Sequence, residues 1–251
     1  MPRQPAVKKS NGNSLFAGSF PEEFIAAFSN RARGNMSLNY ADAKDSLDNR
    51  RNFLGDLGIS PESLVCAKQI HGVEVKRVNT GHKGSGALAY ETALPDVDAL
   101  ITNEKDLTLA IFTADCLPIF LFDPQTRSIG LVHAGWRGTY GGIVQKTLEA
   151  MKKEFHTRPE NVCAQFGPAI RSCCYQVSGD FQSKFSGDID QRGENFFLDL
   201  SGANRKQLSL SGVRLVNIFD CAICTSCCNG EYFSFRKEKD SSGRMISVMA
   251  L

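Results

Sequence analysis

Two of the four histidines and one of the nine cysteines stand where strand-like segments run into sharp turns. His71 is followed by Gly72, Cys116 follows the apolar run 110–112, and His133 ends the apolar run 129–132. Open α/β sheets place their ligand sites at such strand ends. Two imidazoles and one thiolate suit Zn²⁺ in a catalytic site, which keeps one coordination position open for water or substrate. The same donors also fit a single copper ion in a trigonal site.

The spacing of these three residues is not a motif, so only the fold can bring them together. They lie 45 and then 17 positions apart, and each one alone is typical of a core or turn residue. In a zinc enzyme the metal would lower the pKa of a bound water, and Asp115, next to Cys116, is the candidate proton carrier or partner of the ligands. A metal-free alternative makes Cys116 the nucleophile of a cysteine hydrolase that is activated by His133. The other two histidines, His82 and His156, have polar neighbours typical of the surface.

The segment 135–142, Gly-Trp-Arg-Gly-Thr-Tyr-Gly-Gly, connects an expected strand to an expected helix. Free N–H groups at the start of a helix attract anions, and Arg137 adds a guanidinium. The segment is therefore a candidate phosphate site, although it is neither a P-loop nor a dinucleotide fingerprint. The alternative is a tight turn whose glycines only permit the backbone geometry.

A second group of cysteines, Cys221, Cys224, Cys227 and Cys228, has the pattern C-x-x-C-x-x-C-C. The start resembles an iron–sulfur run, but no proline-flanked fourth cysteine follows at the ferredoxin spacing. A structural zinc site would need a second distant C-x-x-C or H-x-H pair, and the adjacent Cys173 and Cys174 do not fit that pattern well. We therefore expect ordinary reduced thiols here.

Hydrophobic periodicity predicts helices alternating with strands, which is typical of a layered α/β domain. Helices are predicted at 45–57, 142–155 and 204–210, and strands at 64–70, 73–75, 97–101, 107–112, 118–122, 129–132, 162–166 and 213–218. Several connections between strands are too short to hold a helix, so the sheet should be mixed rather than all-parallel. We expect a disordered tail over residues 1–14 and one domain over 15–251.

Composition narrows the class of protein further. The chain of 251 residues has a net charge of +2, which does not favour a nucleic-acid binder. It has no apolar run of the ~20 residues that a membrane helix needs. We also expect no secretory signal, because Arg3, Lys8 and Lys9 are not followed by an apolar region. Nine cysteines in such a chain indicate reduced thiols or ligands. We expect a soluble, cytoplasmic globular protein, monomeric or a small homo-oligomer.

A series of short strings then occurs in a fixed order from residue 69 to the C-terminus. They are Gln69-Ile70-His71-Gly72, Asp98-Ala99-Leu100-Ile101-Thr102, Thr113-Ala114-Asp115-Cys116-Leu117-Pro118-Ile119, His133-Ala134-Gly135-Trp136-Arg137-Gly138-Thr139, Gly167-Pro168-Ala169-Ile170, Cys173-Cys174-Tyr175, Asp199-Leu200, Asn204-Arg205, Cys224-Thr225, Phe233-Ser234-Phe235-Arg236 and Gly243-Arg244. Together they resemble the YfiH family, also called the laccase-domain or multicopper polyphenol oxidoreductase family, whose members include purine nucleoside phosphorylases. The resemblance covers roughly residues 28–251.

The resemblance implies an α/β/α sandwich with a mixed sheet and a zinc site at His71, Cys116 and His133. It implies phosphorolysis of adenosine, inosine and methylthioadenosine to a free base and a sugar 1-phosphate, together with deamination of adenosine. It places Ser37, Asn39 and Gln69 on the substrate side. The segment 33–39 is contracted relative to many members, so substrate preference stays open.

Two alternatives remain beside this hypothesis. A copper-dependent polyphenol oxidase is one, although a multicopper centre needs more than four histidines. The other is the Cys116–His133 cysteine hydrolase, acting on peptidoglycan precursors.

Overall fold

The computed structural model describes residues 24–39 and 43–251. The expected disordered tail, residues 1–14, lies outside the described residues. The helices are α1 (Ala43–Asp56), α2 (Trp136–Tyr140), α3 (Ile143–Phe155), α4 (Phe181–Lys184), α5 (Leu200–Leu210) and α6 (Phe235–Glu238). The strands are β1 (Ile25–Phe28), β2 (Leu64–Cys66), β3 (Val75–Arg77), β4 (Ala99–Thr102), β5 (Thr108–Thr113), β6 (Leu117–Asp123), β7 (Ser128–Ala134), β8 (Cys163–Phe166), β9 (Gln176–Val177), β10 (Ile189–Arg192), β11 (Asn195–Leu198), β12 (Ile218–Asp220) and β13 (Met245–Ala250).

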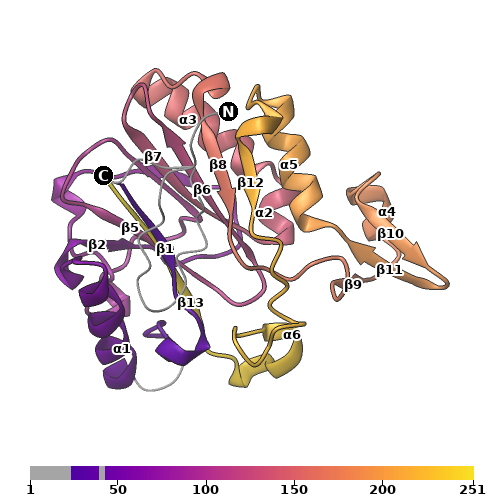
Figure 1. Ribbon diagram of the computed structural model, residues 1–251, viewed down its shortest axis with the longest axis horizontal. Coiled ribbons are helices and arrows are strands. Elements are labelled where there is room, and N and C mark those ends of the chain that lie inside the picture. Colours follow the sequence, from indigo (N-terminus) through magenta and orange to yellow (C-terminus); the bar gives the residue numbers. More distant parts are fainter. Residues whose placement is uncertain (1–23, 40–42) are drawn as a thin grey trace, which may run out of the picture.

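The described strands form three sheets (Figure 1). A four-stranded sheet has the order β1-β13-β5-β2, and a six-stranded sheet has the order β12-β8-β6-β7-β4-β3. Both are mixed: β2 runs parallel to β5 while β13 runs antiparallel to it, and β3 runs parallel to β4 while β7 runs antiparallel to it. The α/β class with mixed sheets, predicted from the sequence, is confirmed. A single mixed sheet was expected, whereas the strands are divided among sheets.

The two large sheets pack face to face between helices, as the alternation of side chains along the strands requires. On β5, Leu109 and Ile111 point to one face and join a core between the sheets with Phe120 and Phe122 of β6. Ala110 points to the other face, toward α1.

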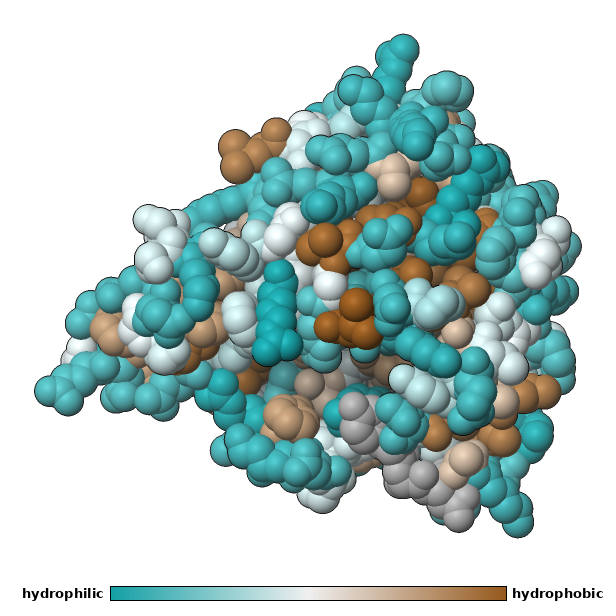
Figure 2. All heavy atoms as spheres, turned by 180° about the vertical axis from the view of Figure 1, so that it is seen from behind, coloured by the Kyte–Doolittle hydropathy of each residue, from teal (hydrophilic) through white to brown (hydrophobic). Residues whose placement is uncertain are grey.

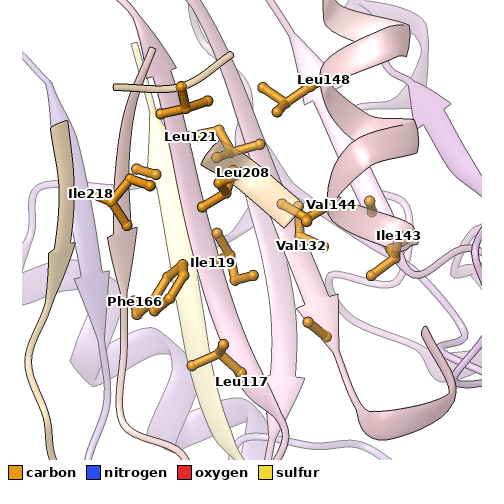
Figure 3. Close-up of a cluster of buried hydrophobic side chains, with 14 of the residues drawn as sticks. Leu117, Ile119, Leu121, Val132, Ile143, Val144, Leu148, Phe166, Leu208 and Ile218 are labelled. Atoms are coloured by element: carbon orange, nitrogen blue, oxygen red, sulfur yellow. The ribbon is translucent and has the colours of Figure 1, made fainter. Parts of the chain in front are cut away.

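On β6 the alternate residues Leu117, Ile119 and Leu121 point away from the four-stranded sheet. They pack with Val144 and Leu148 of α3 and Leu208 of α5, which cover this face (Figure 3). The apolar stripe of α3 is the reason why the sequence 143–155 folds as a helix against the sheet.

The predicted elements match the structure best where apolar runs are buried. The predicted helix 142–155 is α3, with Gly142 as its N-cap, and the predicted helix 45–57 is α1. The predicted strand 64–70 is shorter, since β2 ends at Cys66. The predicted strand 213–218 is largely wrong: residues 215–217 form a 3₁₀ turn, and Leu215 and Val216 are exposed.

A small three-stranded sheet, β10-β11-β9, projects from the body together with α4. It forms the arm at the right of Figure 1 and the wedge at the left of Figure 2. The face seen in Figure 2 is mostly hydrophilic, with apolar side chains gathered near its centre. Among the helices of the described residues, none is both long and apolar enough to cross a membrane.

Candidate active site and metal centre

His71, Cys116 and His133 converge, and crossings between the two large sheets bring them together. Residues 67–74 lead from β2 in the four-stranded sheet to β3 in the six-stranded one, and residues 114–116 lead likewise from β5 to β6. His71 and Cys116 lie on these crossings, and His133 lies near the end of β7. One ligand atom from each residue lies within 4.8 Å of those of the other two. The sequence expectation that these three meet now has a geometric basis.

Asp98, directly before β4, organises this cluster. Its Oδ1 accepts hydrogen bonds from Nδ1 of His133 at 2.8 Å and from the backbone N–H of His71 at 3.0 Å. Its Oδ2 accepts from the N–H of Gly72 at 2.7 Å and of Ile70 at 3.2 Å. Because Nδ1 of His133 donates to Asp98, its Nε2 is left to face Cys116. A carboxylate behind a histidine is the usual way to fix the ring of a metal ligand.

The electrostatics of the cluster favour a thiolate. Burial alone would raise the pKa of Cys116, but the charge of His133 and hydrogen bonds from His133 and His71 lower the pKa well below that of an ordinary thiol. Burial would lower the pKa of His133, but the negative charges of Cys116 and Asp98 raise it. A thiolate is the form of cysteine that binds metal.

Gly135 is the residue that lets the donors approach each other. A Cβ at this position would lie 2.9 Å from Cδ2 of His71 and 3.1 Å from Sγ of Cys116. The glycine therefore belongs to the site itself, because any side chain here would push the donors apart. The convergent His/Cys/His donors, with Asp98 behind them, are a candidate metal site, and this donor set is one that zinc or copper can use.

Two residues of the crossings adopt the left-handed backbone region, which non-glycine residues rarely enter: His71 with φ 62° and Asp115 with φ 84°. The bonds to Asp98 hold His71 in place. The carboxylate of Asp115 accepts from Thr225 Oγ1 at 2.6 Å, from Ser234 Oγ at 3.1 Å and from the N–H of Arg236 at 2.6 Å. Strained backbone conformations of this kind persist where surrounding contacts hold them, and they are frequent at active sites.

A cavity of about 730 Å³ opens beside the three donors. All eight residues singled out from the sequence line it: Ser37, Asn39, Gln69, His71, Asp115, Cys116, His133 and Arg137. Its volume lies in the range of small-molecule sites.

Different contacts hold the expected substrate-side residues, Ser37, Asn39 and Gln69, at the cavity. The amide of Gln69 pairs with the backbone of Phe112 on β5, donating at 2.9 Å and accepting at 2.7 Å. Ser37 is buried and Asn39 exposed. The buried guanidinium of Arg50 donates to the carbonyl of Met36 at 2.7 Å, and so holds the contracted segment at the cavity wall.

The lining combines positive charge with aromatic rings. Arg137, Arg236, Lys239 and Arg244 contribute cations, whereas Asp115 is the acidic group among the described lining residues. The rings are those of Tyr90, Phe112, Trp136, Tyr175 and Phe235. The expected anion segment is a short helix, α2, and Arg137 is exposed with its guanidinium 5.2 Å from the ring centre of Trp136. This wall suits a ligand with an aromatic base and an anionic group.

The sequence analysis did not identify Asp98 as a site residue, nor the cations Arg236, Lys239 and Arg244 that line the cavity. The sequence does contain a signal for Asp98, which is an acidic residue directly before the apolar run 99–101. An acidic residue in such a buried context needs a partner, and this need points to a functional contact. Arg236 has no such signal, since its place depends on the long-range bond to Asp115.

A family model described as "Multi-copper polyphenol oxidoreductase laccase" matches residues 26–251. The chain belongs to this family. It is 35% identical over 225 residues to purine nucleoside phosphorylase YlmD of Geobacillus stearothermophilus, covering 86% of this chain and 82% of the relative. It is 32% identical over 215 residues to adenosine deaminase RL5 of an unknown prokaryotic organism, covering 82% of each chain.

Among solved structures, the fold is similar to that of Bacillus licheniformis hypothetical protein YfiH. The TM-score is 0.87 at 29% sequence identity, and the match covers 91% of this chain and 93% of the other. The YfiH-type family membership expected from the sequence is confirmed, and the names of the relatives support an enzymatic role.

Proposed function

We propose that this protein is a zinc-dependent purine nucleoside phosphorylase that also deaminates adenosine. The observation that carries the proposal is a single cavity that joins the His71/Cys116/His133 donors to a cationic and aromatic wall. The names of two relatives, one a phosphorylase and one a deaminase, support both activities. The products would be a free base with ribose 1-phosphate, or inosine with ammonia.

Phosphorolysis builds positive charge on the ribose and negative charge on the departing purine, so the enzyme has to hold phosphate near the anomeric carbon and stabilise the base. The exposed guanidinium of Arg137 would bind the phosphate. The rings of Phe112 and Tyr175 would stack on the purine. The amide of Gln69, fixed on the backbone of Phe112, would orient it.

His71, Cys116 and His133 would hold the zinc ion. When bound, the ion would supply a Lewis acid for the leaving base or for an attacking water. Asp98 keeps the ring of His133 in the orientation that this requires. Asp115 keeps Arg236 and the segment 225–236 against the cavity, since both of its carboxylate oxygens already accept hydrogen bonds.

The test is product analysis with the zinc-loaded protein. Adenosine and inosine are incubated with and without phosphate, and the products are separated by reverse-phase chromatography. We expect adenine or hypoxanthine with ribose 1-phosphate only when phosphate is present, and inosine from adenosine in both cases. Cys116→Ser should abolish both reactions, whereas Cys163→Ser, on β8 and outside the cavity lining, should not. Turnover of neither nucleoside would reject the proposal.

A cysteine hydrolase is the second candidate, because His133 interacts with Asp98 on one side and with Cys116 on the other, in the order of an acid–base–nucleophile triad. This reading gives no role to His71. Alkylation of Cys116 that is unaffected by a chelator, with loss of a hydrolytic activity that His71→Ala retains, would favour it. A copper oxidase would instead show an intense visible absorption band after copper loading, together with oxidation of a phenol.

A further inference from the structure

Four cysteines outside the cavity lining lie together on two separate turns. Cys173 and Cys174 lie between β8 and β9, and Cys224 and Cys227 lie between β12 and α6. Their four sulfur atoms lie within 4.8 Å of one another. The Sγ of Cys227 is 3.5 Å from that of Cys173 and 3.3 Å from that of Cys174. We propose that these four thiols bind a second, structural zinc ion.

The sulfur–sulfur separations, 3.3 and 3.5 Å for two pairs and no more than 4.8 Å for any pair, bracket the spacing around one tetrahedral ion. Zinc–sulfur bonds of about 2.3 Å place the sulfurs of a tetrathiolate about 3.8 Å apart. A disulfide would select one partner for each sulfur, whereas Cys227 lies almost equally near two. An iron–sulfur cubane would need the thiolates farther apart, because each would bind a different iron. Four protein ligands with no open position are typical of a structural site rather than a catalytic one.

The backbone already holds the two turns in register. The N–H of Ala169 donates to the carbonyl of Ile223 at 3.2 Å, and the N–H of Thr225 donates to the carbonyl of Ala169 at 3.1 Å. Backbone hydrogen bonds from Arg171 and Cys227 reach the thiol of Cys224. Hydrogen bonds to sulfur of this kind support metal-bound thiolates. Backbone hydrogen bonds therefore fix the positions of the two cysteine-bearing turns relative to each other.

The sequence did not predict this site, because a structural zinc site was expected to need a second, distant C-x-x-C or H-x-H pair. The fold supplies the adjacent pair Cys173–Cys174 as the distant half, joined to the C-x-x-C of Cys224 and Cys227. Cys221 and Cys228, which belong to the same run in the sequence, lie outside the cluster.

The site would fix two walls of the cavity. The turn with Cys173 and Cys174 leads into Tyr175, and the turn with Cys224 and Cys227 carries Thr225, which bonds Asp115. Zinc at this position would cross-link the turn before Tyr175 to the segment that leads to Arg236. It would stabilise the cavity without touching substrate.

The first experiment counts zinc in a chain whose other site is disabled. His71→Ala/His133→Ala protein, purified with zinc and freed of loosely bound metal, is analysed by inductively coupled plasma mass spectrometry. We expect one zinc per chain, and none after the further change Cys227→Ser. Cys228→Ser is the matched control, adjacent in sequence but outside the cluster, and should keep one zinc. Absence of zinc in the parent double variant would overturn the proposal, whatever its nucleoside activity.

A second measurement needs no variant. Cobalt loaded into the wild-type chain should give the intense near-ultraviolet thiolate-to-cobalt absorption of a site with four sulfurs, on top of the weaker band of a site with one. Thiol titration of the denatured, metal-free chain should then find all nine cysteines reduced. Absorption from one thiolate only, or a disulfide between these turns in freshly purified protein, would contradict the site.

Discussion

Asp98 shows how one buried carboxylate determines the geometry of a whole site. It is 1% exposed, and it binds one imidazole and three backbone N–H groups. Each of these bonds either orients a proposed ligand or holds the left-handed turn at His71. Removing the charge while keeping the shape should therefore disturb metal binding before it disturbs the fold.

We predict that Asp98→Asn weakens zinc binding at the His71/Cys116/His133 site about 10- to 100-fold, the usual cost of losing the partner of a ligand. Competition with a chromogenic chelator measures the affinity. Asp123→Asn is the matched control, because Asp123 is also buried and caps a turn through Gln125 and Thr126 at the far end of β6. Equal zinc affinity in both variants would contradict the role of Asp98.

Arg137 permits a second test at the level of one residue. Arg137→Ala should raise the KM for phosphate about 10- to 100-fold, since a hydrogen bond to a charged group contributes roughly 1.5–3 kcal/mol. The KM for inosine should change much less. Arg192→Ala, on the exposed strand β10, serves as the control. The KM is measured from initial rates over a series of phosphate concentrations. An unchanged KM for phosphate would show that Arg137 does not bind phosphate.

At the scale of elements, the junction between β7 and α2 determines how close the donors come. Gly135→Ala would place a Cβ 2.9 Å from the ring of His71 and 3.1 Å from the sulfur of Cys116, so one of them has to move. We predict loss of zinc from this site with a native-like circular dichroism spectrum. Gly55→Ala in α1 is the control: its Cβ meets nothing within 4 Å, and alanine should stabilise the helix by up to about 1 kcal/mol. Zinc retained in Gly135→Ala would show that the donors tolerate a side chain there.

The elements also show where prediction from sequence ends. Strands β5, β6 and β7 were predictable because their apolar runs are buried on both faces. The run 213–218 has similar composition, yet Leu215 is 61% exposed and Val216 77% exposed, so composition without a packing partner misleads. The short strand β1 pairs with β13 more than 200 residues away, and no local pattern encodes that register.

The same limit applies to the candidate site. The sequence shows His71, Cys116 and His133 after apolar runs and beside glycine or proline, which is a local signal. In the structure only His133 lies in a strand, whereas His71 and Cys116 lie on the crossings. That two sheets, rather than one, bring them together depends on the crossings at 67–74 and 114–116. The pairing of Cys173 and Cys174 with Cys224 and Cys227 likewise depends on the contact between Ala169 and the segment 223–225. Tertiary contacts thus decide which of the candidate residues meet.

For the whole molecule, one proposed zinc site lines the cavity, and the other lies on turns that continue into Tyr175 of the lining and carry Thr225, the partner of Asp115. Metal binding and folding should therefore be coupled. An ion that binds the native state and not the unfolded chain stabilises it by about 4 kcal/mol when free zinc exceeds the Kd 1,000-fold. For a chain of this size that corresponds to a rise in Tm of roughly 10 °C. We therefore predict that Tm, followed by circular dichroism, rises steadily with buffered free zinc. The rise should be smaller in Cys227→Ser and in His71→Ala/His133→Ala, and absent when these changes are combined. A Tm that does not depend on free zinc in the wild-type chain would show that neither cluster contributes to its stability.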